Sequence, residues 1–185
     1  MTDKLNDIVI ILTVGAPCSG KSTWVVDEAR ALGEQRPIYI ISRDMIREEI
    51  RAKTGGKYIF NKENEGKVTD IFYKSLGMAS LAKGPLIFID NTHCKQVYVD
   101  STIKLFESQI EKGEVRIFIK EFDVPLWKCQ LRNIKRWIQT GKWIPPKAIT
   151  AMYRNKKKMN LKNYNKWNGS YLTLTSAMPT SPEKK

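Results

Sequence analysis

The sequence contains few of the residues that build metal centres and disulfide frameworks. It has one histidine, His93, and three cysteines, none of them in C-x-x-C spacing. One histidine cannot form a zinc site unaided, and nothing around His93 indicates a serine–histidine triad. Three thiols without a pairing pattern are typical of a reducing compartment. We therefore predict a cytoplasmic protein and assign no role to His93 or Cys94.

Long apolar runs are absent as well. None approaches the ~20 residues that cross a bilayer. The apolar run 8–14 is preceded by Asp3 and Asp7, which does not fit a signal peptide. We therefore expect no membrane partner, and a length of 185 residues suits one domain with a sizeable core.

Acidic residues are scarce in the last third of the chain. Residues 1–122 hold 18 Lys and Arg against 17 Asp and Glu, whereas residues 123–185 hold 14 against 2. Nearly all of the net charge of +13 therefore lies in the last third. A basic stretch with interleaved aromatic residues favours a polyanion, either nucleic acid or a triphosphate. A solvated basic face would give the same composition.

A phosphate-binding loop is present near the N-terminus. Residues 15–23 read GAPCSGKST and fit G-x-x-x-x-G-K-[ST] at every fixed position, between an apolar run and a helical pattern. This strand–loop–helix order cradles phosphates with backbone N–H groups. Lys21 is expected to reach the β- and γ-phosphates, and Ser22 to ligate Mg²⁺. The positions expected to bind the triphosphate are Gly15, Pro17, Ser19, Gly20, Lys21, Ser22 and Thr23.

Short apolar runs and amphipathic segments alternate along the chain. The spacing predicts strands at 8–14, 38–41, 86–90 and 115–119, and helices at 21–31, 45–53, 61–83, 95–112, 124–140 and 146–159. This order predicts an α/β, three-layer P-loop NTPase or kinase fold with a parallel sheet of four to five strands and a helical basic lid.

The chain divides into two parts on this pattern. We expect a P-loop kinase domain over 1–160, which includes the lid at about 124–145 and an N-cap at Asp123. A basic polar tail over 161–185 follows, with an edge strand at 171–175 and a disordered end.

Charged residues follow the second and third predicted strands, where ligands bind in parallel sheets. Asp44 could accept the proton of an acceptor hydroxyl or only cap the next helix. Arg47 could grip a phosphate beside that hydroxyl or form a surface ion pair with Asp44. Asp90 could contact Mg²⁺ through water, position Arg47, or cap a helix.

The predicted lid carries two arginines and several tryptophans. Arg132 and Arg136 share one helix face, which suits charge that develops on a γ-phosphate; a solvated basic face is the alternative. The tryptophans are expected to lie in the core more often than to stack on bases. They are Trp127, Trp137 and Trp143.

Several short blocks occur together and in a fixed order. They read GAPCSGKSTW at 15–24, SRDMIR at 42–47, DNT at 90–92, FDVP at 122–125, RNIKR at 132–136, IP at 144–145 and MY at 152–153. In these blocks the chain resembles the phage-type 5′-hydroxyl polynucleotide kinase family, over about residues 7–160. The resemblance implies ATP as donor, Mg²⁺ as cofactor, and a 5′-OH end of RNA or DNA as acceptor in end repair.

The resemblance also implies residue roles. Lys21 would act on the transferred phosphate and Asp44 would be the general base. Arg47 would hold the phosphate on the 3′ side of the terminal nucleotide. Arg136 would be the catalytic lid arginine, supported by Arg132. The acceptor side would include Asp90, Asn91 and Thr92.

The chain departs from the family pattern at several points. Cys18 stands where glycine is common, DNT permutes the commoner Asp-Thr-Asn, and residues 51–58 match poorly. No D-x-D-x-[TV] acid pair is present, so we expect no 3′-phosphatase activity. A kinase of a small metabolite or nucleotide and a non-enzymatic triphosphate-binding module remain as other hypotheses. The sequence does not distinguish RNA from DNA as acceptor or ATP from GTP as donor. It also does not determine the length of the acceptor or the oligomeric state.

Overall fold

The computed structural model describes residues 7–32, 36–56 and 58–167. Its strands are β1 (Ile8–Val14), β2 (Ile38–Ile41), β3 (Leu86–Ile89) and β4 (Val115–Glu121). Its helices are α1 (Lys21–Leu32), α2 (Arg43–Lys53), α3 (Lys62–Ser80), α4 (Gln96–Lys104), α5 (Glu107–Glu111), α6 (Leu126–Thr140) and α7 (Pro146–Lys157). None of the helices in these ranges has the length and apolar character of a membrane span. The predicted edge strand 171–175 and the predicted disordered end lie outside the described residues.

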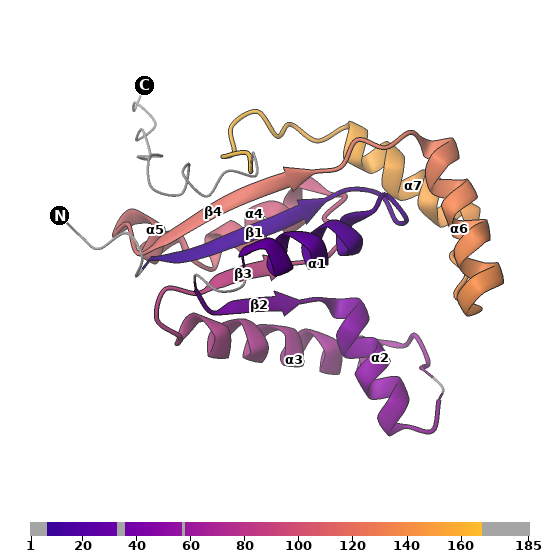
Figure 1. Ribbon diagram of the computed structural model, residues 1–185, viewed down its shortest axis with the longest axis horizontal. Helices are drawn as coiled ribbons and strands as arrows, with labels where there is room; N and C mark the ends of the chain where they lie inside the picture. Colours follow the sequence, from indigo (N-terminus) through magenta and orange to yellow (C-terminus); the bar gives the residue numbers. More distant parts are fainter. Residues whose placement is uncertain (1–6, 33–35, 57, 168–185) are drawn as a thin grey trace.

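The four strands form one parallel sheet in the order β2-β3-β1-β4 (Figure 1). β1 lies between β3 and β4, and its residues from Val9 to Leu12 are fully buried. A continuous apolar run is what a strand covered on both faces requires. The predicted α/β class with a parallel sheet of four to five strands is confirmed.

Helices cover both faces of the sheet, so the fold has three layers (Figure 1). Val9 and Ile11 of β1 pack in a cluster with α1 residue Val25. Ile10 and Leu12 point to the opposite face, where they join the cluster that contains Phe72 of α3. Each fully buried side chain of this kind contributes about 1.5–3 kcal/mol. The packing on both faces therefore fixes the positions of the carboxyl ends of the strands.

Several helix boundaries differ from the prediction, and two of these differences change an interpretation. The single helix expected over 95–112 is wrong: α4 ends at Lys104 and α5 begins at Glu107. Phe106 breaks the helix with φ −113° and ψ 11°, because its ring is buried in the core. α2 begins at Arg43, after an extended Ser42, so Asp44 lies in the first turn. The alternative that Asp44 is the N-cap of this helix is therefore excluded.

The lid predicted at about 124–145 contains α6, and α7 packs against α6 at one end of the sheet, so we call the two helices together the lid (Figure 1). α6 ends as expected at Gly141, whose φ of 69° suits glycine. The N-cap predicted at Asp123 is wrong, because Pro125 is the residue that precedes α6. The Asp123 carboxylate instead accepts hydrogen bonds from Lys156 and Lys157 of α7. These ion pairs tie the end of α7 to the chain that enters α6.

The chain after α7 returns to the sheet. Leu161 and Trp167 are buried, and Lys166 forms a parallel bridge with Ile119 of β4. The Trp167 ring packs edge-on against Phe118, and its indole N–H donates to Glu28 of α1. The folded part therefore continues past residue 160, where we placed the start of the tail.

The only histidine is a structural residue in the loop after β3. His93 is buried, and its Nδ1–H donates to the Thr13 carbonyl at 2.9 Å. Its backbone φ is 41°, a region in which histidine and asparagine are tolerated. Burial lowers the pKa of His93 from 6.5 to about 4, so the ring is neutral near neutral pH. It joins the end of β1 to the loop that follows β3.

We expect this buried ring to make the fold sensitive to acid. Because the folded protein resists protonation of His93, the free energy of unfolding should fall as pH drops from 6.5 to about 4. The full shift corresponds to about 3 kcal/mol. In the variant His93→Asn the amide N–H can replace the hydrogen bond to Thr13, but it does not titrate. Urea denaturation at several pH values should give a shallower pH dependence for this variant, and parallel curves would contradict the prediction.

Candidate functional site

The carboxyl ends of β1, β2 and β3 meet at one edge of the sheet. The phosphate loop follows β1, α2 follows β2, and Asp90 follows β3. The loops are joined by the hydrogen bond from the Gly15 N–H to the Thr92 carbonyl at 3.0 Å. The Asn91 side chain accepts from the Arg43 N–H at 3.1 Å, at the start of α2. The parallel order of the strands thus gathers three predicted site segments.

The backbone of the phosphate loop depends on its glycines. A Cβ on Gly15 would lie 2.8 Å from the Ser19 hydroxyl and 2.9 Å from the Cβ of Phe122, so no side chain fits there. Gly20 has φ 96°, which favours glycine. Cys18 has φ 62°, in the left-handed region, although it is not a glycine. The backbone is therefore locally strained at Cys18, where the chain departs from the family pattern.

Lys21 is a buried cation in the loop. Its ammonium donates to the Gly15 carbonyl at 3.0 Å and to the Ala16 carbonyl at 2.8 Å. Burial lowers the pKa of Lys21, and the negative charge of Asp90 opposes this shift. Neutral carbonyls compensate only part of the charge, so the loop attracts an anion.

Ser22 and Asp90 form the part of the site that suits Mg²⁺. Burial raises the pKa of Asp90, and hydrogen bonds from the Ser22 and Thr13 hydroxyls oppose the rise. The charge of Asp44 raises the pKa of Asp90 further, which indicates that the two carboxylates lie near each other. Within the described ranges no three His, Cys, Asp or Glu side chains are placed to hold a metal. A hydroxyl and one carboxylate fit Mg²⁺, which takes its other ligands from phosphates and water.

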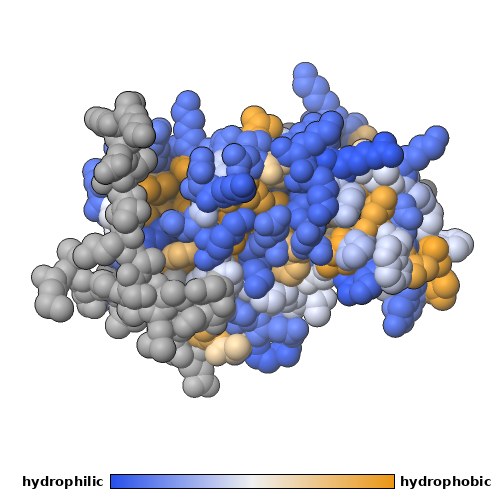
Figure 2. Space-filling model, turned by 90° about the horizontal axis from the view of Figure 1, so that it is seen from above, coloured by the Kyte–Doolittle hydropathy of each residue, from blue (hydrophilic) through white to orange (hydrophobic). Residues whose placement is uncertain are grey.

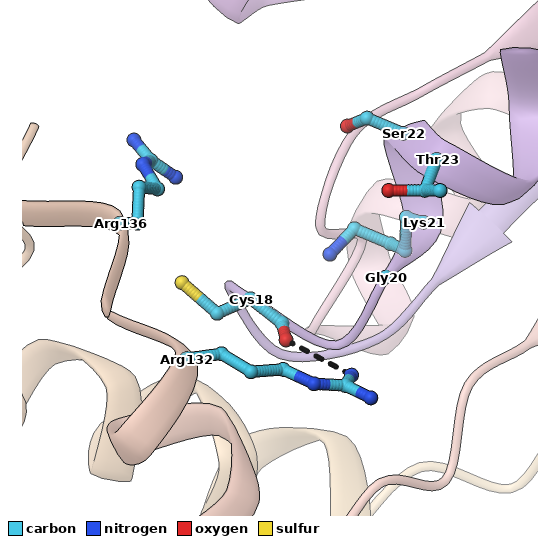
Figure 3. A pocket seen from close by; sticks show the side chains of 7 residues that line it. All are labelled: Cys18, Gly20, Lys21, Ser22, Thr23, Arg132 and Arg136. Carbon is cyan, nitrogen blue, oxygen red and sulfur yellow. Dashed lines mark hydrogen bonds between the residues drawn. The ribbon is translucent and has the colours of Figure 1, made fainter. Parts of the chain in front are cut away.

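The lid arginines face the phosphate loop across a cavity of about 450 Å³. In Figure 3, Arg136 lies on the α6 side of this cavity, opposite Lys21 and Ser22. Arg132 donates from Nη1 to the Cys18 carbonyl at 3.4 Å. α6 is held in this place by Asn133, which donates to the Ile144 carbonyl, and by packing of Cys129 against Ala16. Both predicted arginines are therefore beside the predicted triphosphate site.

Asp44 and Arg47 lie together at the start of α2. The Arg47 Nη1 donates to Asp44 Oδ1 at 2.6 Å, and 87% of the Asp44 side chain is exposed. The Arg47 guanidinium also makes two parallel hydrogen bonds to Glu65 of α3, at 2.9 and 2.8 Å. These bonds to Arg47 hold the pKa of Glu65 at about 2, and they raise the pKa of Arg47.

Arg43 and Arg51, which lie one turn before and after Arg47 on α2, do not form an isolated anion site with it. Arg51 pairs with Glu48 at 2.8 Å, and Arg43 lies over the Phe72 ring and donates to Thr69. Arg47 itself uses three N–H groups on Glu65 and Asp44, which leaves two of its five donors.

Sequence reasoning missed the side chains that α3, the segment before it and the lid contribute. Glu65 and Tyr58 complete the surroundings of Arg47, because the Tyr58 hydroxyl donates to Glu65 Oε1 at 2.7 Å. Lys142, just after α6, forms an ion pair with Glu48 of α2 at 2.8 Å. Spacing of 18 or 94 residues carries no local signal for such contacts.

The tryptophans of the lid do not lie in the core, contrary to our expectation. Trp127, Trp137 and Trp143 are 58%, 53% and 46% exposed. Trp137 and Trp143 pack edge to face at 5.7 Å, and the Lys128 ammonium lies over the Trp127 ring. The spacing correctly predicts a helix, but the buried side of α6 is the one with Cys129 and Asn133, and Trp127 and Trp137 lie on the exposed side.

The parallel sheet, the phosphate loop and the arginine-bearing helix define a P-loop protein of the kinase fold. More particularly, the chain belongs to the AAA domain family, whose model matches residues 10–157. This match supports the expected nucleotide-binding P-loop kinase domain.

Solved structures show the same fold. A chain of the Pnkp1/Rnl/Hen1 RNA repair complex is 23% identical, with a TM-score of 0.66 over 84% of this chain and 46% of its own. The present chain thus spans less than half of that protein. Kti12 of Chaetomium thermophilum, solved with ADP-AlF3, is 12% identical, with a TM-score of 0.58 over 90% of this chain and 94% of its own. The APS kinase CysC of Mycobacterium tuberculosis, solved with AMPPNP and APS, is 18% identical, with a TM-score of 0.52 over 72% of each chain.

We expect Cys18→Gly to stabilise the protein. A non-glycine residue in the left-handed region costs about 1–2 kcal/mol, and the added freedom of glycine in the unfolded chain offsets about 0.5–1 kcal/mol of that gain. The free energy of unfolding should rise by up to about 1.5 kcal/mol in urea denaturation. Cys18→Ala is the control, because it removes the thiol and keeps the Cβ. A glycine variant less stable than the alanine variant would show that φ at this position is not strained.

Proposed function

We propose that the protein transfers the γ-phosphate of ATP to the 5′-hydroxyl end of a polynucleotide, RNA or DNA, in nucleic-acid end repair. The observation that carries the proposal is the pair of Asp44 and Arg47, an exposed carboxylate and a guanidinium 2.6 Å apart, at the same sheet edge as the phosphate loop. A phosphate cradle alone fixes only the donor. This pair supplies groups for an acceptor that carries a hydroxyl next to a phosphate.

Each side of the site has a separate chemical task. On the donor side, Lys21 and the loop N–H groups bind the phosphates, and Arg132 and Arg136 stabilise charge on the transferred group. On the acceptor side, Asp44 accepts the proton of the attacking hydroxyl, and the two remaining Arg47 donors bind the neighbouring phosphate. Mg²⁺, held by Ser22 and Asp90, would neutralise charge on the β- and γ-phosphates.

Exposed cations and aromatic rings on the lid support a polynucleotide as acceptor. Lys135, Lys147 and Arg154 are exposed and form no ion pair within the described residues. Figure 2 shows hydrophilic residues over most of one face, with hydrophobic ones between them at the end where α6 lies. Cations beside stacking rings favour single-stranded nucleic acid. The likeness to a chain of an RNA repair complex agrees with this acceptor.

A small-molecule kinase is the second candidate. Its support is the state of Arg47, whose contacts with Glu65 and Asp44 leave only two donors for an acceptor phosphate. An acceptor that carries no phosphate would not need any further hydrogen-bond donors from Arg47. The likeness in fold to an APS kinase is compatible with this candidate as well. A small acceptor would not explain why the lid carries exposed cations and aromatic rings.

The deciding measurement is transfer of label from γ-labelled ATP to a 5′-OH oligonucleotide, with nucleosides and sugars as competing acceptors. We expect the oligonucleotide to be labelled, and Asp44→Asn to lower the turnover number by about 10²–10⁴-fold while ATP affinity stays unchanged. Asp27→Asn, which changes an exposed acid of α1, is the matched control. Labelling of small acceptors only would overturn the proposal. Loss of ATP binding in Asp44→Asn would show that its role is structural.

Oligonucleotide binding should weaken steeply with salt. Three phosphate contacts to a single strand give a slope of about −2 in log affinity against log salt, which is a loss of roughly 20-fold between 50 and 200 mM. Replacing Lys135, Lys147 and Arg154 by Gln should flatten this slope, as measured by fluorescence anisotropy. Lys67→Gln is the control, since Lys67 is paired with Glu63 on α3. An unchanged slope in the triple variant would place the nucleic acid elsewhere.

A further inference from the structure

An exposed aromatic ring lies beside the candidate acceptor residues and has no task in the function proposed above. Phe60 precedes α3 and is 75% exposed, the largest value for any aromatic side chain in the described part of the chain. It lies just after the segment 51–58, in which the chain departs from the family pattern.

Phe60 is fixed to the acceptor side by an unbroken series of contacts. The Arg47 guanidinium lies over the Phe60 ring at 5.6 Å from its centroid, and Tyr58 meets the same ring edge-on at 5.0 Å. Tyr58 and Arg47 both bind Glu65, and Arg47 binds Asp44. Tyr58 also packs against the main hydrophobic cluster, which anchors the series to the core. The ring is thus held in place and still open to a ligand.

This arrangement suits a flat, uncharged ligand next to a phosphate. Aromatic rings bind nucleobases by stacking, with little dependence on which base is present. Arg47 contacts both the ring and Asp44, so a base on Phe60 would have its sugar and phosphate near Arg47 and its hydroxyl near Asp44. A sugar or another acceptor without a base gains nothing from the ring.

Resting on the proposed function, we propose that Phe60, supported by Tyr58, is the stacking site for the base of the 5′-terminal nucleotide of the acceptor. The acceptor class is then narrower than a hydroxyl beside a phosphate: it is a nucleotide end that carries an unpaired base. The ring gives affinity for the base without choosing its identity.

The test compares two acceptors that differ only in one base. One is a single-stranded 5′-OH oligonucleotide, and the other is the same strand with an abasic tetrahydrofuran residue at its 5′ end. At saturating ATP we expect wild-type protein to prefer the base-bearing strand about tenfold in kcat/KM, mainly through KM. Phe60→Ala should abolish the preference, Phe60→Trp should keep it, and the KM for ATP should not change. Leu81→Ala, which removes an exposed side chain at the far end of α3, is the matched control.

Two results would overturn the inference and one would separate it from the proposed function. Equal use of both strands by wild type, or an equal loss on both strands in Phe60→Ala, would show that the ring only covers Arg47. If wild type phosphorylates neither strand, transfer to polynucleotides fails. Anisotropy with the same two strands, labelled at the 3′ end, then decides the stacking site. A tenfold tighter binding of the base-bearing strand that Phe60→Ala removes supports the site, and equal binding refutes it.

Discussion

The buried charge of Lys21 is the constraint on which the rest of the site depends. The Lys21 ammonium is bonded to two carbonyls of its own loop and opposed at a distance by Asp90. Burial disfavours the charged form of both groups. Because their charges are opposite, each group stabilises the ionised state of the other. A polyphosphate can neutralise this positive charge, which its neighbours compensate only in part, and can accept hydrogen bonds from loop N–H groups. Gly15, which no side chain could replace without displacing Phe122, keeps the loop in the shape that buries this charge.

The proposed acceptor side is built separately, and Asn91 is one of the residues that join it to the donor side. Arg47 and Glu65 connect α2 to α3 without contact to the phosphate loop. Asn91 connects the halves, since its side chain accepts from the first N–H of α2 and its carbonyl accepts from the Thr13 hydroxyl at 2.9 Å. Asn91 thus connects the two sides of the site. The backbone carbonyl of Thr92 adds a further link, because it accepts a hydrogen bond from the Gly15 N–H.

The features that were predictable from the sequence are those with a local signal. Continuous apolar runs located all four strands, and one short motif located the phosphate loop. Glu65 was not predictable, because its pairing with Arg47 depends on how α2 and α3 pack. The break at Phe106 was not predictable either, because no glycine or proline lies in the segment 95–112. The exposed tryptophans show that amphipathic spacing defines the faces of α6 but not which face meets the protein.

The ion pair of Lys142 and Glu48 has a consequence for the speed of the catalytic cycle. It joins the end of the arginine-bearing helix to the helix that carries Asp44, and so spans the donor and acceptor sides. Both side chains are about two-fifths exposed, and a pair of this kind contributes under about 1 kcal/mol and weakens with salt. The two halves can therefore part at little energetic cost. For the function proposed above, a weak link of this kind allows the phosphorylated product and the spent nucleotide to leave independently, whereas a strong link would keep both bound.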